Sequence, residues 1–511
     1  MTYSQEEHDK VVSKKDAEIA DLKRQIANFN SSLYGSKSEK SQGPLETNPN
    51  QPFLGFPGAD FLSEPENEEK ASSKTKLKSK SKKSGGNRMV FPEDIETEDL
   101  VLSPPESERT NPETGNILPK ISEEITEKLI LQKAKWKKLR IIKPVYGGGK
   151  KYGVVKAVRV ESVLGYSQFD ETVVADILTR RFCDHTPFYR ICEIYQRDEL
   201  FTTRQTLNKL ALDFSQQPLQ LGKLLKEEIL KLNSVHMDET PVKMQMKGKG
   251  KLHQAYMWLL CGSPPGAAGP LIWMKFEDNR QEKHVKYILG DYKGILHSDA
   301  YSGYEKLAPI NGYSWAMCWV HARRKFIKAT ECDLQKTIVK MMSKIMGEDN
   351  KTDDMAPEAR LTYRQEKLTP MVDDFIKHLE TVQYSNQVLV SKSLSEACSY
   401  FLKRLDSFKC FLNHSEAKMD NNAAERLIRP FTIGRKNWLF VGSKRGGDSS
   451  AILYSLLQSC RSIGVNPRDY IENVMRRLPY TAKEDLIHLL PHKWLKKENP
   501  ISPYLPYGYN P

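Results

Sequence analysis

The sequence has little cysteine and no long apolar run. Its 511 residues contain 8 cysteines, and none of them forms a CxxC pair. Such spacing excludes the disulfide-dense secreted domains and the usual zinc ribbons, so reduced thiols in a cytoplasmic protein are expected. No stretch of about 18 uninterrupted apolar residues occurs, and the first residues, MTYSQEEHDKVVSKKD, are polar where a signal peptide has an apolar core. We therefore expect no membrane segment and no export.

Acidic residues are outnumbered by basic ones. The chain has 78 Lys and Arg against 65 Asp and Glu, a formal net charge of +13 and a pI of about 9.1. This balance favours a polyphosphate partner such as DNA and association with the nucleoid, although ribosomal and membrane-surface proteins share it. A chain of this length is also expected to divide into several domains.

Three segments are expected ahead of the first clear run of helices. Residues 1–40 predict a coiled-coil helix for self-association, with a lone surface helix as the alternative, because apolar residues recur there at steps of three, four and seven. Residues 41–88 are rich in Pro, Asn, Ser and Lys and predict a disordered basic linker. Residues 89–165 alternate β-branched and charged residues, which predicts a small β-rich module with one helix. The apolar positions of the first segment are Val12, Ile19, Leu22, Ile26, Phe29 and Leu33.

Residues 166–232 carry apolar positions at helical spacing. TVVADILTRRF, FYRICEIYQRDEL and TTRQTLNKLALDF predict consecutive helices, and Thr202 or Thr203 is a suitable N-cap for the third. Short helices with a basic third member fit a helix-turn-helix-like DNA-binding region. They fit an ordinary helical bundle equally well, so both interpretations stay open.

The pattern changes to strands at residue 233. VHMDETPVKMQ, HQAYMWLLCG and PLIWMKFEDN predict three strands joined by turns, and GILHSDAY and YSWAMCWV predict a fourth and a fifth, each after a helix. This order is that of a ribonuclease H-like core, a mixed five-stranded sheet with helices, in an α/β multidomain protein. We assign the core to residues 233–330 and 416–465, a helical insertion to 331–415 and a C-terminal segment to 466–511. In the second part of the core, DNNAAERLIRPF, GRKNWLFVG and SSAILYSLLQSCRSIG predict a helix, a strand pair and a helix.

Two aspartates are expected at strand ends. Asp238 closes the first strand ahead of a Thr-Pro that stops it, and Asp299 ends the fourth. Because the first and fourth strands are neighbours in such a sheet, the two carboxylates converge across one strand spacing of about 4.8 Å, where they repel unless a cation lies between them. Glu239 is a rival to Asp238. Successive strand residues face opposite sides, so only one of them points at Asp299, and spacing alone does not choose.

Glu425 is the candidate for a third carboxylate. It falls in the first turns of a predicted helix for which Asp420 or Asn421 is a good N-cap. Three hard oxygen ligands suit Mg²⁺ or Mn²⁺, and two such ions about 4 Å apart activate an attacking hydroxyl and stabilise a leaving 3′ oxygen. Among 65 acidic residues other triads are conceivable, so an ordinary structural role for each carboxylate stays open.

Histidine and cysteine side chains accompany these carboxylates. His236 and His297 each precede an aspartate by two residues and share its face of the strand. Cys318 and His321 have the spacing of half a zinc site without a second half. All four are candidates for metal ligation or for support of the ligands, and ordinary structural roles are favoured.

Basic residues cluster on the segments that carry the acidic candidates. Beside a scissile phosphate they would neutralise neighbouring backbone phosphates, although each one alone is more often a solvated charge. The candidate DNA contacts are Arg323, Arg324, Lys325, Arg426, Arg429, Arg435, Lys436, Lys444 and Arg445.

Four separated blocks resemble the signature blocks of the IS66-family transposases, in the order of that family. They are HMDETPVK, HSDAYSGYEKL, CWVHARRKF and DNNAAERLIRPFTIGRKNWLFVGSKRGGDSSAILYSLLQSC. The resemblance implies a DDE transposase with Asp238 and Asp299 at the aspartate positions and Glu425 at the glutamate, and so it selects Asp238 over Glu239. It also implies action on the inverted-repeat ends of a bacterial insertion element, with accessory proteins encoded beside it. We expect a homo-oligomer with two Mg²⁺ or Mn²⁺ ions at each active site.

The chain departs from that family's pattern at one place. The family commonly has a cysteine-based zinc-finger-like module after the basic linker, whereas this chain has no cysteine before Cys183. The module at 89–165 is therefore expected to hold its shape by packing, without zinc. Two other functions stay open: a DNA-binding regulator that has lost catalysis, and a nuclease on the same fold. The presence of all three carboxylates favours the active transposase.

Overall fold

The computed structural model describes residues 167–246, 251–383 and 392–495, with short pieces between 136 and 165. The predicted coiled-coil helix, the basic linker and most of the β-rich module lie outside the described residues. Within that module, the strands β1 (Val145–Gly147) and β2 (Val154–Lys156) pair antiparallel. In the part of the chain that the structure describes, no helix combines the length and the apolarity needed to span a bilayer.

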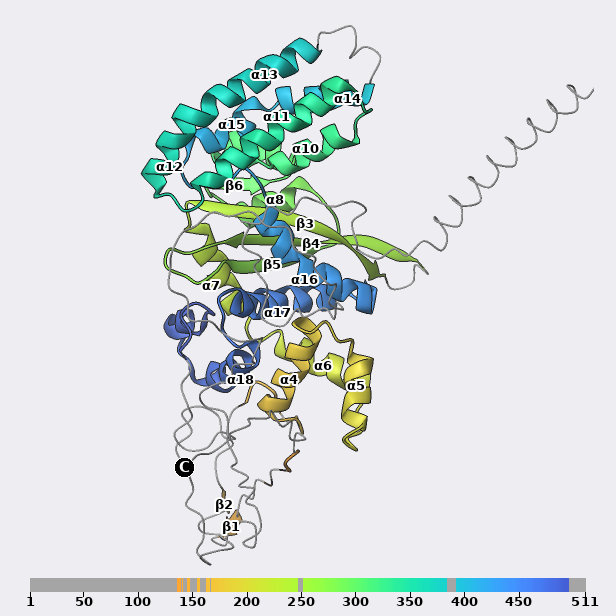
Figure 1. Cartoon of the computed structure of the whole chain (residues 1–511). Helices are drawn as coiled ribbons and strands as arrows, with labels where there is room; N and C mark the ends of the chain where they lie inside the picture. Colours follow the sequence, from red (N-terminus) through yellow and green to blue (C-terminus); the bar gives the residue numbers. More distant parts are fainter. Residues whose placement is uncertain are drawn as a thin grey trace, which may run out of the picture. The chain divides into compact units, whose positions relative to one another are not determined.

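One mixed sheet lies at the centre of the described chain (Figure 1). Its strands stand in the order β5-β4-β3-β6-β7. β3 pairs antiparallel with β4 and parallel with β6, β4 pairs antiparallel with β5, and β6 pairs parallel with β7. The sequence therefore predicted correctly that its first and fourth strands are neighbours. The strands are β3 (Ser234–Gln245), β4 (Leu252–Gly262), β5 (Leu271–Glu277), β6 (Ile295–Ser298), β7 (Ser314–Met317) and β8 (Phe440–Val441).

The run VHMDETPVKMQ is a strand, as predicted, but the Thr-Pro after Asp238 does not stop it. β3 continues through Thr240 and Pro241 to Gln245, so Asp238 lies within the strand and not at its end. The carbonyl of Pro241 accepts a hydrogen bond from Arg435 on the side away from β4. The missing N–H of this proline therefore faces the same side, and no hydrogen bond to β4 is lost.

Among the described residues, four helices lie between residues 171 and 230: the three named from the sequence and one more, and Thr203 caps the third through the N–H of Thr206 at 3.2 Å. The first three enclose a small apolar cluster of their own around Ile177, Ile191 and Leu207. The fourth helix packs instead on β4 and β5 and belongs to the core. These helices are α4 (Glu171–Phe182), α5 (Phe188–Gln196), α6 (Arg204–Phe214) and α7 (Leu219–Leu230).

Both edges of the sheet are covered by helices. Along β5, helix α17 (Lys444–Ser462) contributes Ser455 and Ser459, whose hydroxyls accept from the backbone N–H groups of Met274 and Ile272 at 2.7 and 2.9 Å. Along β7, helix α15 (Leu405–Asn413) packs against the strand. The edge N–H groups of β5 are thereby satisfied within the chain, which removes an edge open to pairing with other strands.

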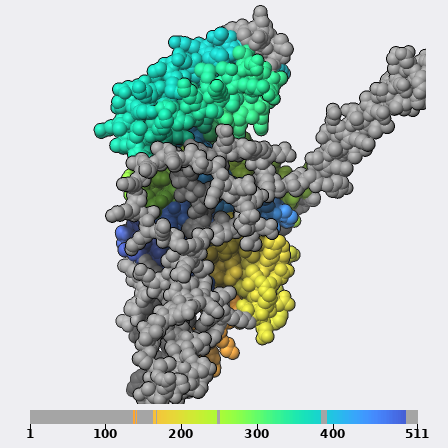
Figure 2. All heavy atoms as spheres, in the orientation of Figure 1, coloured from red at the N-terminus to blue at the C-terminus, as the bar shows by residue number. Residues whose placement is uncertain are grey.

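The predicted insertion is helical and gathers into one body, green to cyan in Figure 2. Its core surrounds Trp319, whose ring lies 5.1 Å from that of Phe401 and 5.8 Å from that of Phe375, centroid to centroid. The Trp319 indole also donates to the carbonyl of Phe408 at 2.9 Å, so the insertion packs on the start of α10. The helices are α10 (Trp319–Lys328), α11 (Asp333–Asp349), α12 (Pro357–Tyr363), α13 (Thr369–Gln383) and α14 (Lys392–Leu402).

The strand pair predicted in GRKNWLFVG is wrong. Helix α16 (Asn422–Trp438) takes up the first half of this segment, and the second half forms only the two-residue strand β8, beside the far end of β3. The helix persists because the rings of Phe431 and Trp438 contact each other and Phe431 also contacts Tyr454 of α17, which favours burial on one helical face. Three further helices are α8 (Glu282–Leu289), α9 (Ser302–Asn311) and α18 (Pro467–Arg477).

Candidate active site

Three carboxylates meet where β3, the end of β6 and the start of α16 come together. Asp238 lies within β3, Asp299 follows the last residue of β6, and Glu425 lies in the first turn of α16. His236 is the register partner of His297. Two residues further along the chain are Asp238, on the same face of β3 as His236, and Asp299, just beyond the end of β6.

The charges of this group act on one another. Burial, followed by the negative charges of Glu239, Asp299 and Glu425, raises the pKa of Asp238 to about 8. Its carboxylate accepts one backbone hydrogen bond, from the N–H of Glu239 at 2.9 Å. A carboxyl group held among other carboxylates gains most from a nearby cation.

Glu425 brings an unsatisfied oxygen to the group. Its Oε2 accepts from Arg324 at 3.1 Å, while its Oε1 is buried and has no hydrogen-bond partner among the described residues. An orphaned buried carboxylate oxygen and two further carboxylates are the donors that Mg²⁺ and Mn²⁺ prefer, so these residues fit such a cation. The ligand oxygens of the three carboxylates do not all lie within 4.8 Å of one another.

Glu239 has partners of its own. It is ion-paired with Arg280, and its Oε2 accepts from the hydroxyl of Tyr304 at 2.7 Å. Arg280 also lies 3.5 Å from Asp299, over the ring of Tyr301. Sequence reasoning missed Arg280 and Tyr304, because nothing local marks a side chain that reaches the site from a loop or a helix.

The charge of Asp299 acts on both Asp238 and Glu239. Burial first, and the charge of Asp299 second, raise the pKa of Glu239, and the charge of Asp299 also raises that of Asp238. That only one of the two points at Asp299 stays a prediction, because a charge acts at a distance whichever way a side chain points, and Asp299 lies beyond the last residue of β6.

The two strand histidines are structural and neutral. The rings of His236 and His297 stack with centroids 4.2 Å apart. His297 donates from Nδ1 to the carbonyl of Val235 at 3.1 Å and accepts at Nε2 from the N–H of Lys418 at 2.8 Å. Burial lowers the pKa of both rings, that of His236 to about 4. They join β3, β6 and the chain ahead of α16.

Asn421 sets the start of α16, a role that sequence reasoning missed. It occupies the N-cap position, but its amide donates to the carbonyl of Met237 at 2.8 Å and accepts from His236 at 2.9 Å. Asp420 supplies the capping oxygen instead, to the N–H of Asn422 at 2.9 Å. The first turn of α16, which carries Glu425, is therefore anchored on β3.

Cys318 and His321 lie on the other side of Glu425. The Cys318 sulfur accepts from the N–H of Asn421 at 3.2 Å, and His321 Nε2 lies 3.6 Å from Glu425 Oε1. Their metal-binding atoms and that of Glu425 lie within 4.8 Å of one another. Burial raises the pKa of the Cys318 thiol to about 12, so the protonated sulfur serves here as a hydrogen-bond acceptor.

Comparison with known families accounts for this arrangement. The family model described as "Transposase IS66 family" matches residues 166–449, which hold the sheet, the insertion and all three carboxylates. The chain belongs to the IS66 transposase family. Residues 455–492 match the IS66 C-terminal element, and residues 21–99 match the model described as "Transposase C of IS166 homeodomain". Membership in the IS66 family supports a transposase role with DNA as the partner.

Three proteins of Sinorhizobium fredii are similar to this IS66-family chain, and all three are described as uncharacterized. Protein y4qI is 30% identical over 373 residues, 70% of this chain and 68% of that protein. Protein y4hP is 26% identical over 435 residues, 80% of this chain and 77% of that protein. Protein y4jD is 24% identical over 492 residues, 93% of this chain and 95% of that protein.

Several basic residues of the IS66-family signature blocks bind groups of the chain itself. Arg323 contacts Ser343, Arg324 contacts Glu425, Lys325 lies over Tyr400, Arg435 contacts Thr240, Lys444 contacts Asp448, and Arg445 contacts Asp213. The exposed members of the set are Arg324, Lys325, Arg426, Arg429, Lys436, Lys444 and Arg445. Exposure therefore does not select one part of this set, and their contact with DNA stays a prediction.

Proposed function

We propose that this chain is a DDE transposase. Asp238, Asp299 and Glu425 would bind two Mg²⁺ or Mn²⁺ ions for cleavage at the inverted-repeat ends of an insertion element and for strand transfer into target DNA. The observation that carries this proposal is the placement of the three carboxylates on β3, at the end of β6 and in the first turn of α16, where Glu425 Oε1 is buried without a hydrogen-bond partner among the described residues. Burial and the charges of Glu239, Asp299 and Glu425, which raise the pKa of Asp238, agree with a site that gains from a cation.

The topology of the sheet supports a ribonuclease H-like core. Three antiparallel strands are followed by two that run parallel to the first, in the order β5-β4-β3-β6-β7. The proposed ligands belong to the neighbouring parallel strands β3 and β6 and to α16, which lies against β3. In this fold the arrangement leaves the carboxylates at one edge of the core, open to a DNA backbone.

The residues around the carboxylates have separate tasks in the proposed reaction. Asp238 and Asp299 would hold the metal ions from the sheet, and Glu425 would hold them from α16. When bound, such ions would supply activation of the attacking water or 3′ hydroxyl and stabilisation of the leaving oxygen. Arg280 and Arg324 contact Asp299 and Glu425 and place positive charge where a phosphate would approach.

Metal dependence tests the proposal. The full chain should nick a supercoiled plasmid that carries the element's ends in Mg²⁺ or Mn²⁺, and EDTA should abolish nicking because no group of the chain replaces the metal-activated nucleophile. Strand-specific sequencing of the nicked product maps the cut. A chain that binds the ends but cuts them in no divalent metal would be a regulator, and cutting away from the ends would indicate a nuclease.

A variant of Glu239 tests whether this residue binds metal or only holds the Arg280 side chain in place. Glu239→Gln should keep nicking within about tenfold of the native rate, because its partners are Arg280 and Tyr304 and its role is to hold the guanidinium. The measurement is the single-turnover nicking rate beside that of Asp238→Asn. Should the two variants lose activity equally, Glu239 would be a ligand and the assignment of Asp238 alone would be wrong.

A further inference from the structure

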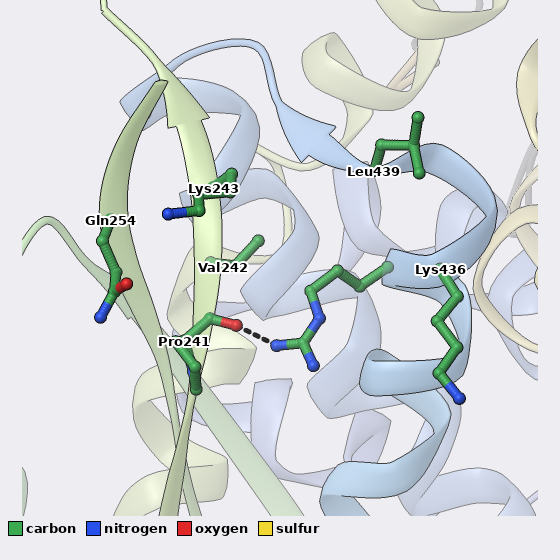
Figure 3. Close-up of a pocket in the computed structure, with 7 residues that line it drawn as sticks. Pro241, Val242, Lys243, Gln254, Lys436 and Leu439 are labelled. Atoms are coloured by element: carbon green, nitrogen blue, oxygen red, sulfur yellow. Dashed lines mark hydrogen bonds between the residues drawn. The ribbon is translucent and has the colours of Figure 1, made fainter. Parts of the chain in front are cut away.

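A pocket lies at the far end of β3, outside the carboxylate group. Lys243 and Gln254 border it from the sheet, and Lys436 and Leu439 border it from the end of α16 (Figure 3). Arg435 and Pro241 also line the pocket, and Arg435 of α16 donates a hydrogen bond to the carbonyl of Pro241. Two elements that hold proposed metal ligands, β3 and α16, therefore both extend to this pocket.

The turn after α16 presents large apolar side chains to solvent. Leu439 is 66% exposed and Phe440 is 41% exposed. Leu439 has φ 67 and ψ −51, although a branched side chain at positive φ is strained. Burial of the leucine does not offset this strain. An exposed, strained apolar turn points to a binding surface.

The apolar turn is flanked by cations. Phe440 is the register partner of Lys243, which is in turn the register partner of Gln254. The three side chains thus form a row across β8, β3 and β4, and all three are exposed. Lys436 is exposed in the last turn of α16. A phosphate chain is complementary to positive charge on both sides of an apolar surface.

We propose that Leu439 and Phe440 form a stacking platform for an unpaired base of a single DNA strand, with its phosphates on Lys243 and Lys436. Aromatic surfaces beside a basic groove bind single strands in this way, because every base has a stacking face and every nucleotide a phosphate. A partner protein or a second copy of the chain would match the apolar turn but not the two lysines beside it, Lys243 and Lys436.

The distance to the carboxylates fits a strand that continues into them. Lys243 is five residues beyond Asp238 on β3, a span of about 17 Å at the strand rise. If the bases stay stacked as in one strand of a duplex, at about 3.4 Å per nucleotide, that span corresponds to roughly five nucleotides. The identity of this strand as the cleaved end rests on the proposed function, whereas binding of the strand by the turn does not.

Photo-cross-linking in EDTA tests the platform without any need for catalysis. The full chain is mixed with a single-stranded oligonucleotide that carries 5-iodouracil, irradiated and digested, and cross-linked peptides are identified by mass spectrometry. The native chain should yield a cross-link in the peptide that contains Phe440. Leu439→Gly and Phe440→Ala should reduce its yield by about 5- to 50-fold, the effect of losing one stacked base.

Matched variants distinguish a loss of base stacking from a loss of phosphate binding and from a loss of folding stability. Glycine tolerates positive φ, so Leu439→Gly should unfold at no lower urea concentration than the native chain. Lys243→Ala should lower the salt dependence of oligonucleotide binding by about 0.7 in log–log slope, whereas Leu439→Gly leaves it unchanged. Ile310→Ala, at an exposed apolar residue of α9, should cross-link as the native chain does.

The outcomes are distinct. Native-level cross-linking in both Leu439→Gly and Phe440→Ala overturns the platform. A change of oligomeric state in these variants, with unchanged cross-linking, overturns it in favour of an interface between copies of the chain. Asp238→Asn should still give the cross-link, so loss of the platform and failure of the proposed catalytic site are seen separately.

Discussion

Asp238→Asn should lower the rate of Mg²⁺-dependent nicking by at least about a thousandfold, because an amide cannot supply the negative ligand that a divalent ion requires. Asn keeps the shape of Asp and still accepts the N–H of Glu239. Loss of a carboxyl group crowded by Glu239, Asp299 and Glu425 should leave the free energy of unfolding no lower than in the native chain. The measurements are the single-turnover nicking rate and urea unfolding.

The same loss of nicking is expected for Asp299→Asn and Glu425→Gln. Asp291→Asn, at an exposed acid near β6, is the matched control and should cut at the native rate. All four variants should bind the element's ends as tightly as the native chain in EDTA. A triad variant that cuts at the native rate is not a metal ligand, and the proposed set would then lose that member.

Arg364→Met should reduce the free energy of unfolding by about 3–5 kcal/mol, because it leaves a buried carboxylate without its partner. The guanidinium is 1% exposed and bonds to Asp349 at 2.8 Å. It also donates to the carbonyls of Phe411 and Ala417 at 3.1 and 2.8 Å, which then lose a donor. Urea denaturation of the full chain measures the change.

Two further variants make the Arg364 prediction specific. Lys392→Met removes a cation from an exposed pair of the same insertion, 4.0 Å from Glu396, and should cost less than about 1 kcal/mol. Replacing both members of the buried pair, as Arg364→Met with Asp349→Leu, should recover much of the loss, since no charge is left buried alone. If Arg364→Met unfolds like Lys392→Met, the buried pair does not hold the insertion together.

These contacts show what the helical insertion contributes to the site. Arg364 binds the carbonyls of residues 411–417, the segment that leads directly into α16. Further along, the N–H of Lys418 bonds to His297 and the carbonyl of Met419 accepts from the N–H of Trp319. The insertion and the strands thus fix the chain just before Glu425. Destabilising the insertion should therefore also lower nicking, although Arg364 lies outside the carboxylate group.

Much of the core was predictable because its signals are local. Alternating or continuous apolar runs bounded by Gly and Pro marked the five strands, and apolar residues at helical spacing marked α4, α5 and α6. Strand order followed from the sequence of elements, and with it the adjacency of His236 and His297. The positions of Asp238, Asp299 and Glu425 on three adjoining elements followed in turn from that order.

The sequence by itself thus determined the elements, their order and the acidic candidates, since each depends on neighbours along the chain. Only the tertiary structure decided how side chains distant in sequence share one site. Arg435 allows β3 to pass through Pro241, Tyr454 keeps GRKNW helical, and Arg280 joins Glu239 to Asp299. The side chain of Asn421 likewise makes no capping hydrogen bond to α16 and instead donates to the carbonyl of Met237 on β3. Each of these contacts joins residues more than a dozen positions apart in the sequence. Local periodicity in the sequence therefore does not predict them.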